Sequence, residues 1–182
     1  MNSTLQTSGP SAGPVGWLIQ SPRRTLWLIT AVCGGLLAYG LYLQHAVGLE
    51  PCPMCIVQRY ALLLVAVLSG ATALAKAGPV RMAGLIAVVV AAGLGAFVAA
   101  RQSWLQWYPP EVLSCGRDLY GMIEAFPLQR VIPMVFKGSG DCSAIDWTFL
   151  GLTIANWSFL SFSAIVAVCA LLMVKRAASG AA

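Results

Sequence analysis

The stretch VRMAGLIAVVVAAGLGAFVAA, residues 80–100, carries a single charged side chain, Arg81. A helix needs about 20 mostly apolar residues to cross a bilayer core roughly 30 Å thick. Lipid cannot hydrogen-bond to the backbone, whereas a helix satisfies its own N–H and C=O groups. Residues 80–100 therefore predict a membrane-spanning helix.

Small residues recur at every fourth position of this stretch, at Ala83, Ala87, Ala91, Gly95 and Ala99. Such a face would let another helix approach closely. A general richness in alanine would give the same pattern, so both interpretations stay open.

Three further apolar runs lie at residues 26–43, 56–75 and about 156–174. Charged residues make up 9% of the 182 residues, against roughly 25% in soluble domains. Four such runs in one small chain favour a membrane protein over a soluble protein with buried helices. We expect an all-α membrane protein, a four-transmembrane-helix bundle with a long, disulfide-containing periplasmic loop at residues 101–155.

The charged residues flank opposite ends of these runs. The basic group comprises Arg23, Arg24, Lys76, Arg81, Lys175 and Arg176, and all six acidic residues lie beyond the other end. Basic flanks are usually cytoplasmic, so both termini should lie inside, with loops 44–55 and 101–155 outside. Residues 1–24 and 176–182 would be cytoplasmic tails, the first disordered because it is rich in Ser, Gly, Pro and Thr. No basic run exceeds two residues, so the net charge of +5 does not predict nucleic-acid binding.

Four of the six cysteines fall on the outer side, at Cys52, Cys55, Cys115 and Cys142. An even number of cysteines in an oxidising compartment suggests disulfides. They could form two structural bridges or two redox-active pairs. Cys33 and Cys169 lie within the apolar runs, where a free cysteine behaves as a small apolar residue.

Cys52 and Cys55 form a C-x-x-C motif in EPCPMCIVQR, residues 50–59. A disulfide stabilises a fold more when it closes a longer loop, so this pair suits redox chemistry better than stapling. The second expected helix begins here, after Pro51 and Pro53, which a first helical turn tolerates. Free backbone N–H groups and the helix dipole at that point favour a thiolate over a thiol.

Arg59 follows Cys55 by four residues and shares its helix face. A cation just inside the membrane is costly, so such residues tend to face a cavity. A side chain that reaches out to lipid headgroups is the alternative. In the functional interpretation, Arg59 stabilises a Cys55 thiolate and donates hydrogen bonds to an electron acceptor at membrane depth.

Zinc binding competes for the same cysteines, because a structural site needs four nitrogen or sulfur ligands. The four outer cysteines could supply them, with His45, the single histidine, as a spare. No second closely spaced ligand pair accompanies Cys52 and Cys55, and exported thiols meet oxidants. We therefore expect no metal, and we expect His45 to be an interfacial polar residue.

Three stretches resemble the bacterial inner-membrane disulfide bond formation protein B (DsbB) family. They are QHAVGLEPCPMCIVQRYAL at 44–62, LQWYP at 105–109 and PMVFKGSGDCSAIDWTFLGL at 133–152. They stand in the family's order among four hydrophobic spans, and the resemblance covers about residues 25–175. The combination of C-x-x-C-x-x-x-R at a helix start with later S-G-D-C and W-x-F-L-G-L is specific.

The resemblance implies a function. The family oxidises a soluble periplasmic thioredoxin-like dithiol oxidase, DsbA, and passes two electrons to a membrane quinone, either ubiquinone or menaquinone. It implies that the partner attacks the Cys115–Cys142 disulfide and forms a mixed disulfide with Cys115. Cys142 would then exchange with Cys52, while Cys55, beside Arg59, would engage the quinone ring.

One position departs from the family pattern. Some members have a histidine near the quinone, four residues before the glutamine of the LQ-x-YP motif. Here that glutamine is Gln106, and the position four residues before it is Gln102. The resemblance therefore assigns no role to Gln102.

Two alternatives come from other classes. The vitamin K epoxide reductase-like family is also four-helical and quinone-linked, but its C-x-x-C begins a late membrane helix rather than the second. The non-enzymatic alternative is a membrane protein with structural disulfides or a bound metal.

Overall fold

The computed structural model describes residues 21–76, 78–108, 143 and 145–180. Its helices are α2 (Pro22–His45), α3 (Pro53–Leu74), α4 (Pro79–Trp107) and α6 (Ile154–Gly180). All four are long and apolar enough to cross a membrane. The expected fold class, a four-helix membrane bundle, is confirmed.

Proline marks the start of three of these helices, at Pro22, Pro53 and Pro79. The first helical position suits proline, because its N–H would have no intrahelical partner there and its φ is already helical. The helices therefore begin one to four residues before the apolar runs do.

The helix ends differ from the expected boundaries. Residues 101–107 were expected to belong to the long loop, but α4 continues through them to Trp107. No glycine or proline occurs between residue 101 and Pro109, so nothing in this stretch breaks the helix. The helix therefore continues beyond the end of the apolar run. For the same reason α6 extends to Gly180, into the expected tail, and residues 22–24 of the other expected tail are helical.

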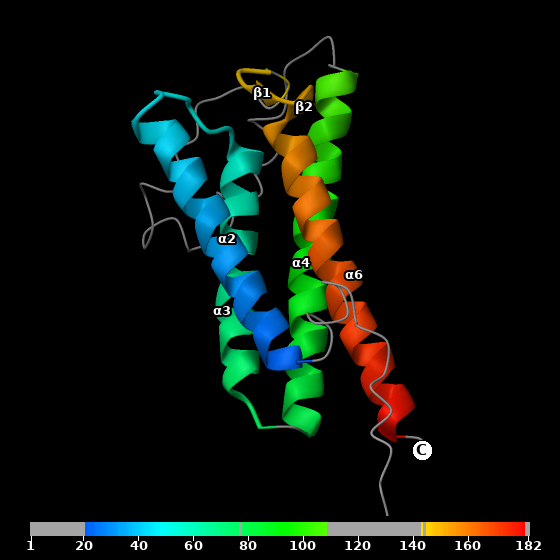
Figure 1. Ribbon diagram of the computed structural model, residues 1–182. Helices are drawn as coiled ribbons and strands as arrows, with labels where there is room; N and C mark the ends of the chain where they lie inside the picture. Colours follow the sequence, from blue (N-terminus) through cyan, green and yellow to red (C-terminus); the bar gives the residue numbers. More distant parts are fainter. Residues whose placement is uncertain (1–20, 77, 109–142, 144, 181–182) are drawn as a thin grey trace, which may run out of the picture.

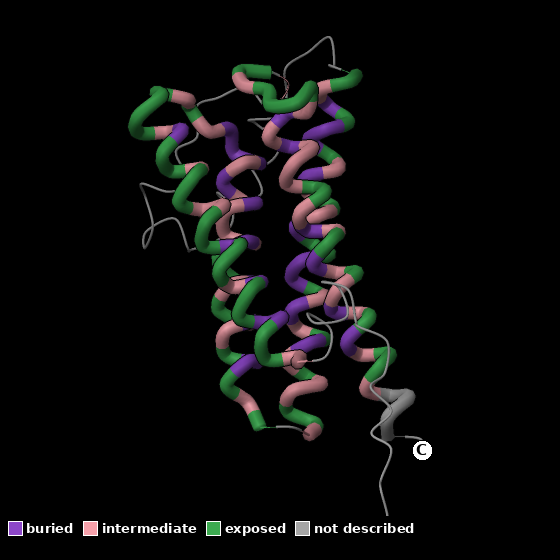
Figure 2. The backbone as a smooth tube through the Cα atoms, viewed as in Figure 1, coloured by how far each residue is buried: buried purple, intermediate pink, exposed green. Residues whose placement is uncertain are grey.

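Neighbouring helices run antiparallel and pack in the order α2, α3, α4, α6 (Figure 1). Buried positions lie mostly toward the middle of the bundle, and exposed positions lie mostly on its outside (Figure 2). The core includes Leu26, Val65, Val88 and Phe162, and it also contains Cys33 and Cys169, which are fully buried. Large apolar side chains such as Phe97 remain 72% exposed on the outside, as expected for a surface that contacts lipid.

Gly95 of α4 shows why a small residue is needed on this face. A Cβ atom there would lie 2.6 Å from the ring of Phe162 on α6. Ala91 and Ala99, one turn away on either side, are also buried, whereas Ala83 is exposed. Part of the small-residue face therefore does allow close helix packing, between α4 and α6.

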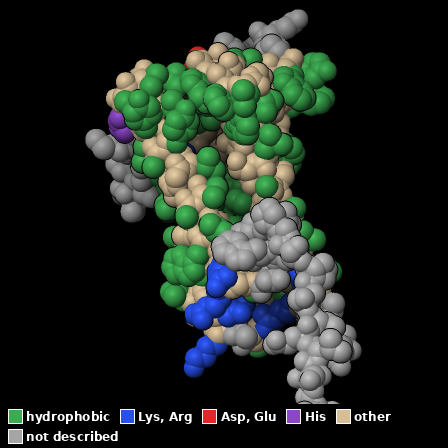
Figure 3. Space-filling view, viewed as in Figure 1, with side chains coloured by type: hydrophobic (Ala, Val, Ile, Leu, Met, Phe, Trp, Pro, Cys, Tyr) green, Lys and Arg blue, Asp and Glu red, His purple; other side chains and the backbone are tan. Residues whose placement is uncertain are grey.

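The end of the bundle that holds the α3–α4 turn, residues 75–78, is called here the basic end (Figure 3). Arginines from three helices donate hydrogen bonds to backbone carbonyls beside this turn. Arg23 Nε donates to Ala73 O at 2.9 Å, Arg81 to Ala75 O at 2.8 Å, and Arg176 to Gly78 O at 2.9 Å. Ala73 and Ala75 lie at the end of α3, where a helix leaves its last C=O groups without intrahelical partners, and Gly78 is the N-cap residue of α4.

The opposite end is called here the thiol end, because it contains Cys52 and Cys55. A small antiparallel hairpin covers part of it, formed by β1 (Thr148–Phe149) and β2 (Leu152–Thr153). Its two turn residues, Leu150 and Gly151, both have positive φ, as a two-residue hairpin turn requires. The sequence alone predicts only a loop for this segment.

Candidate functional site

The thiol pair is positioned by the first turn of α3. Cys52 is the N-cap residue, and its sulfur accepts a hydrogen bond from the backbone N–H of Cys55 at 3.3 Å. This geometry folds the Cys52 side chain back over the helix start, so the two sulfurs lie 3.1 Å apart. The two sulfurs are hydrogen-bonded rather than joined in a disulfide in this structure, and Cys52 is buried against Met54 and Leu105. The pair is therefore placed to form or break a disulfide without movement of the helix.

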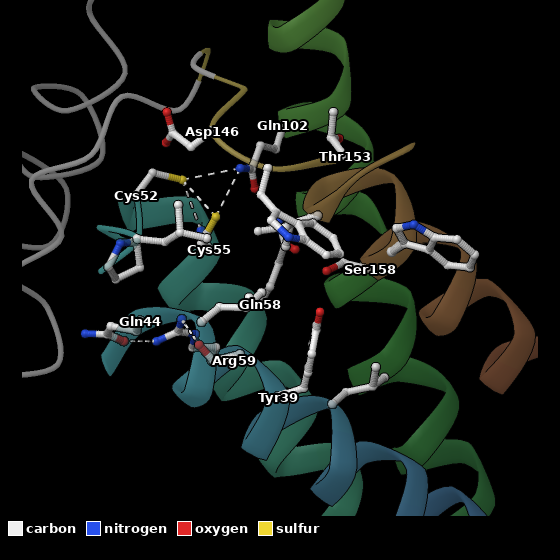
Figure 4. Close-up of a pocket in the computed structure, with 18 of the residues that line it drawn as sticks. Tyr39, Gln44, Cys52, Cys55, Gln58, Arg59, Gln102, Asp146, Thr153 and Ser158 are labelled. Atoms are coloured by element: carbon white, nitrogen blue, oxygen red, sulfur yellow. Dashed lines mark hydrogen bonds between the residues drawn. The ribbon is translucent and has the colours of Figure 1, made fainter. Parts of the chain in front are cut away.

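Gln102 of α4 contacts both sulfurs. Its Nε2 donates hydrogen bonds to Cys55 Sγ at 3.1 Å and to Cys52 Sγ at 3.3 Å (Figure 4). Its Oε1 accepts a hydrogen bond from Gln58 Nε2 at 2.6 Å. Gln58 and Gln102 are each only 3% exposed. The structure thus places a chain of buried polar groups, Gln58–Gln102–thiol pair, across the α3–α4 interface.

Arg59 lies between α3 and α2. Its guanidinium donates to the backbone carbonyl of Gly40 at 3.0 Å and to the side-chain oxygen of Gln44. Within the described part of the chain, the hydrogen bonds to Cys55 Sγ come from Cys52 and Gln102, not from Arg59. Arg59 lines the same cavity as Cys55, and its stabilisation of a Cys55 thiolate stays a prediction.

A cavity of about 410 Å³ opens between the helices beside the thiol pair. All four helices and the hairpin segment contribute to its wall, and Tyr39 and Ser158 point into it (Figure 4). The polar side chains in its wall include Gln58, Arg59, Gln102 and Asp146. The volume and mixed lining match those of typical small-molecule sites.

Aromatic side chains form the outer wall of this cavity. The Trp147 ring stacks on Phe149 at a centroid distance of 6.0 Å and meets Tyr39 of α2 edge-on at 6.1 Å. Trp157 of α6 packs against Phe149 and donates its indole N–H to the Phe149 carbonyl at 3.1 Å. The hairpin is thereby held against α2 and α6, over the space that the thiols face.

The other predicted site residues are only partly placed. Cys115 and Cys142 lie outside the described residues, so their pairing and their distance from Cys52 stay predictions. Ile145 and Asp146, which follow Cys142 closely in sequence, do line the cavity. Among the described residues no group of three or more His, Cys, Asp and Glu side chains could hold a metal ion, and His45 is exposed at the end of α2.

Sequence reasoning missed Gln58 and gave Gln102 no role. A signal was present, because a polar side chain inside a membrane span is costly and tends to be functional. Gln58 stands beside Arg59 in an apolar run. Gln102 lies just beyond the run at 80–100, in the stretch that was assigned to a loop.

Comparison with known proteins gives consistent matches. The family described as "Disulfide bond formation protein DsbB" matches residues 22–172. The chain is 68% identical over 156 residues to disulfide bond formation protein B of Polaromonas sp. (strain JS666 / ATCC BAA-500). This alignment covers 86% of the chain and 93% of the Polaromonas protein. It is 60% identical over 161 residues to the protein of the same name in Albidiferax ferrireducens, covering 88% and 92% respectively. The corresponding protein of Polaromonas naphthalenivorans is 63% identical over 161 residues, covering 88% and 96%.

Proposed function

The chain belongs to the DsbB family of disulfide bond formation proteins, and from this premise we propose that it is a quinone-linked thiol oxidase. It would reoxidise a periplasmic thioredoxin-like dithiol oxidase of the DsbA type through two redox-active disulfides. Its family and its four spans make it a disulfide-forming, multi-pass membrane protein. The family match over 22–172 argues against the vitamin K epoxide reductase-like alternative.

The observation that carries the proposal is the position of the thiol pair in the wall of a mostly apolar cavity inside a membrane bundle. Thiols that served a soluble acceptor would have no need of such a space. The cavity is large enough for a quinone ring, since small-molecule sites usually measure about 300–1,000 Å³. When bound, a quinone would take up the two electrons and two protons that the Cys52–Cys55 dithiol loses as it becomes a disulfide.

The residues around the cavity would bind and orient this acceptor. Arg59 carries five N–H donors, and its described hydrogen bonds to α2 use only part of this capacity. The remaining N–H groups could donate to an acceptor oxygen. Tyr39, Trp147 and Phe149 would exclude water from the ring and from the sulfurs.

The second disulfide would connect this buried site to the partner. A partner thiolate would attack Cys115, break the Cys115–Cys142 bond and leave Cys142 as a thiolate. Cys142 would then attack Cys52, break the Cys52–Cys55 disulfide and release Cys55 as the thiolate that faces the cavity. The second thiol of the partner would release the oxidised partner from Cys115, and the freed Cys115 would re-form the Cys115–Cys142 disulfide and leave Cys52 and Cys55 reduced. The segment that follows Cys142 supports this order, because Ile145 and Asp146 line the cavity that contains Cys52 and Cys55.

The distribution of charge supports a placement in the bacterial inner membrane with the thiol end facing the periplasm. Arg23, Arg81 and Arg176 gather at the opposite end, and basic residues flank membrane helices mainly on the cytoplasmic side. The thiols would then lie on the side where oxidising chemistry takes place.

The test is reduction of quinone by the purified protein in detergent, supplied with a reduced DsbA-type partner. We expect multiple turnovers with either ubiquinone or menaquinone, and none with the Cys55→Ala variant. Cys33→Ala is a matched control, because Cys33 is buried in the core away from the cavity. Partner oxidation without quinone consumption would contradict the proposed acceptor.

A further inference from the structure

We propose that Gln102 is a catalytic residue that stabilises the thiolate of Cys55 through its side-chain amide, and that Gln58 is the positioning residue that orients this amide. Gln102 is a neutral hydrogen-bond donor that touches both reacting sulfurs. The described hydrogen bonds of Arg59 go instead to Gly40 and Gln44 of α2.

The orientation of the Gln102 amide follows from its two sets of contacts. A glutamine side chain has one accepting end and one donating end. Gln58 Nε2 donates to the accepting end at 2.6 Å, so the donating end faces the sulfurs at 3.1 and 3.3 Å. Both amides are buried, so water does not compete strongly for these bonds. Gln58 thus acts on the thiols without touching them.

A neutral donor suits this location. The thiolate is the reactive form of cysteine, and N–H groups that point at the sulfur favour it over the thiol. A second cation beside Arg59 would serve the same purpose, but charge within a membrane bundle is costly. An amide supplies the hydrogen bond without that cost, and it adds to the backbone N–H of Cys55, which donates to Cys52 Sγ at the start of α3.

The same contact bears on the redox balance of the pair. A disulfide sulfur is a weak acceptor, so the Gln102 hydrogen bonds stabilise the reduced pair more than the oxidised pair. A protein disulfide becomes a stronger oxidant when its reduced form is stabilised. Gln102 therefore favours transfer of electrons into Cys52–Cys55. This consequence for turnover rests on the proposed function, whereas the effect on the thiols themselves does not.

The experiment measures alkylation of Cys55 by iodoacetamide against pH in the full-length, reduced protein, read by mass spectrometry of the Cys55 peptide. The variants are Gln102→Met, which keeps the length of the side chain, and Gln58→Met, which removes only the orienting donor. Ser103→Ala is the matched control, since Ser103 is a buried neighbour on α4 whose hydroxyl makes no hydrogen bond within the described residues. The titratable or charged groups around the cavity stay the same in all variants: Tyr39, Glu50, Cys52, Arg59 and Asp146.

We expect the midpoint pH of Cys55 alkylation to rise by about one unit in Gln102→Met, because a hydrogen bond to a charged group is lost. Gln58→Met should raise it by a smaller amount in the same direction, and Ser103→Ala should leave it unchanged. Cys33 and Cys169 report folding in the same samples, because both are fully buried and should stay unmodified in a folded variant.

An unchanged midpoint in Gln102→Met would overturn the inference. A rise in Gln102→Met without any rise in Gln58→Met would overturn the positioning role of Gln58. The dithiol–disulfide equilibrium with glutathione gives a second measure, in which Gln102→Met should shift about tenfold toward the disulfide. None of these measurements needs quinone or partner, so a wild-type protein that failed to reduce quinone would contradict the proposed function alone.

Discussion

At the basic end of the bundle, arginines from α2, α4 and α6 hold the carbonyl groups beside the α3–α4 turn. At the thiol end, Arg59 lies between α2 and α3 and lines the cavity beside Cys55. The first three arginines donate to backbone carbonyls at or beside the α3–α4 turn, and the fourth lines the cavity inside the bundle. The comparison shows that position relative to the cavity, rather than residue type, separates a stabilising arginine from a candidate functional one.

The largest expected effect is an all-or-none difference in reporter activity, which tests whether the thiol end or the basic end faces the outside of the cell. An alkaline phosphatase reporter, active only after export, should be inactive when fused after Gly78 and active when fused after Gly140. The reason is the concentration of arginine and lysine at the basic end. Activity after Gly78 would reverse the assignment of the two ends.

Loss of either predicted disulfide should abolish continuous turnover, but in different ways. Cys115→Ser should stop partner oxidation while Cys52–Cys55 can still be oxidised by quinone. Cys52→Ser should leave the outer disulfide able to react once but not to be regenerated. Stopped-flow partner oxidation and steady-state quinone reduction separate the two results, and sustained turnover in both variants would contradict two pairs in series.

Exchange of one arginine at each end tests the comparison directly. Arg59→Met should raise the apparent KM for quinone about ten- to hundredfold, because hydrogen bonds to or from charged groups contribute about 1.5–3 kcal/mol. Arg59→Lys should be intermediate, since it keeps the charge but loses the planar set of donors. Arg176→Met, the matched variant at the basic end, should leave both Michaelis constants unchanged. Steady-state kinetics with each substrate varied in turn provide the measurement. An Arg59→Met protein with an unchanged KM for quinone would indicate that Arg59 only reaches toward the lipid headgroups.

The smallest expected effect is on stability at the basic end. Arg176→Met removes the hydrogen bond from α6 to the Gly78 carbonyl. For a half-buried bond of this kind we expect a loss of about 1 kcal/mol, which corresponds to roughly 2–4 °C in Tm for a chain of this size. Thermal unfolding in detergent measures it, and no change in Tm would show that the bond to the turn contributes nothing measurable.

The fold could be predicted from the sequence because hydrophobicity dominates it. Each apolar run became a helix, and a proline preceded three of them. The end of α4 could not be predicted in the same way. Residues 101–107 are less hydrophobic than the run before them, so the sequence predicts a loop there. In the structure α4 continues through these residues and packs in the bundle, where Gln102 and Leu105 are buried.

The sequence predicts the reactive cysteines of the candidate site, but it does not predict which side chains contact their sulfurs. The C-x-x-C spacing and a helix start indicate reactive thiols from local sequence alone. The contact between Gln58 and Gln102 joins residues 44 positions apart, and it depends on how α3 and α4 are rotated against each other. Local sequence carries little information about that rotation, so only the assembled bundle shows which polar group faces the sulfurs.

The short turn at residues 75–78 has a consequence at the far side of the membrane. Cys55 and Gln102 are separated from this turn by roughly 28 and 34 Å of helix respectively, at about 1.5 Å per residue. Insertion or deletion of one residue within α4, between Pro79 and Gln102, would rotate the rest of that helix by about 100° and shift it by about 1.5 Å. Either change would carry the Gln102 amide away from the sulfurs. The number of helical residues between this turn and Gln102 therefore decides whether the amide meets the thiol pair on the opposite side of the bilayer.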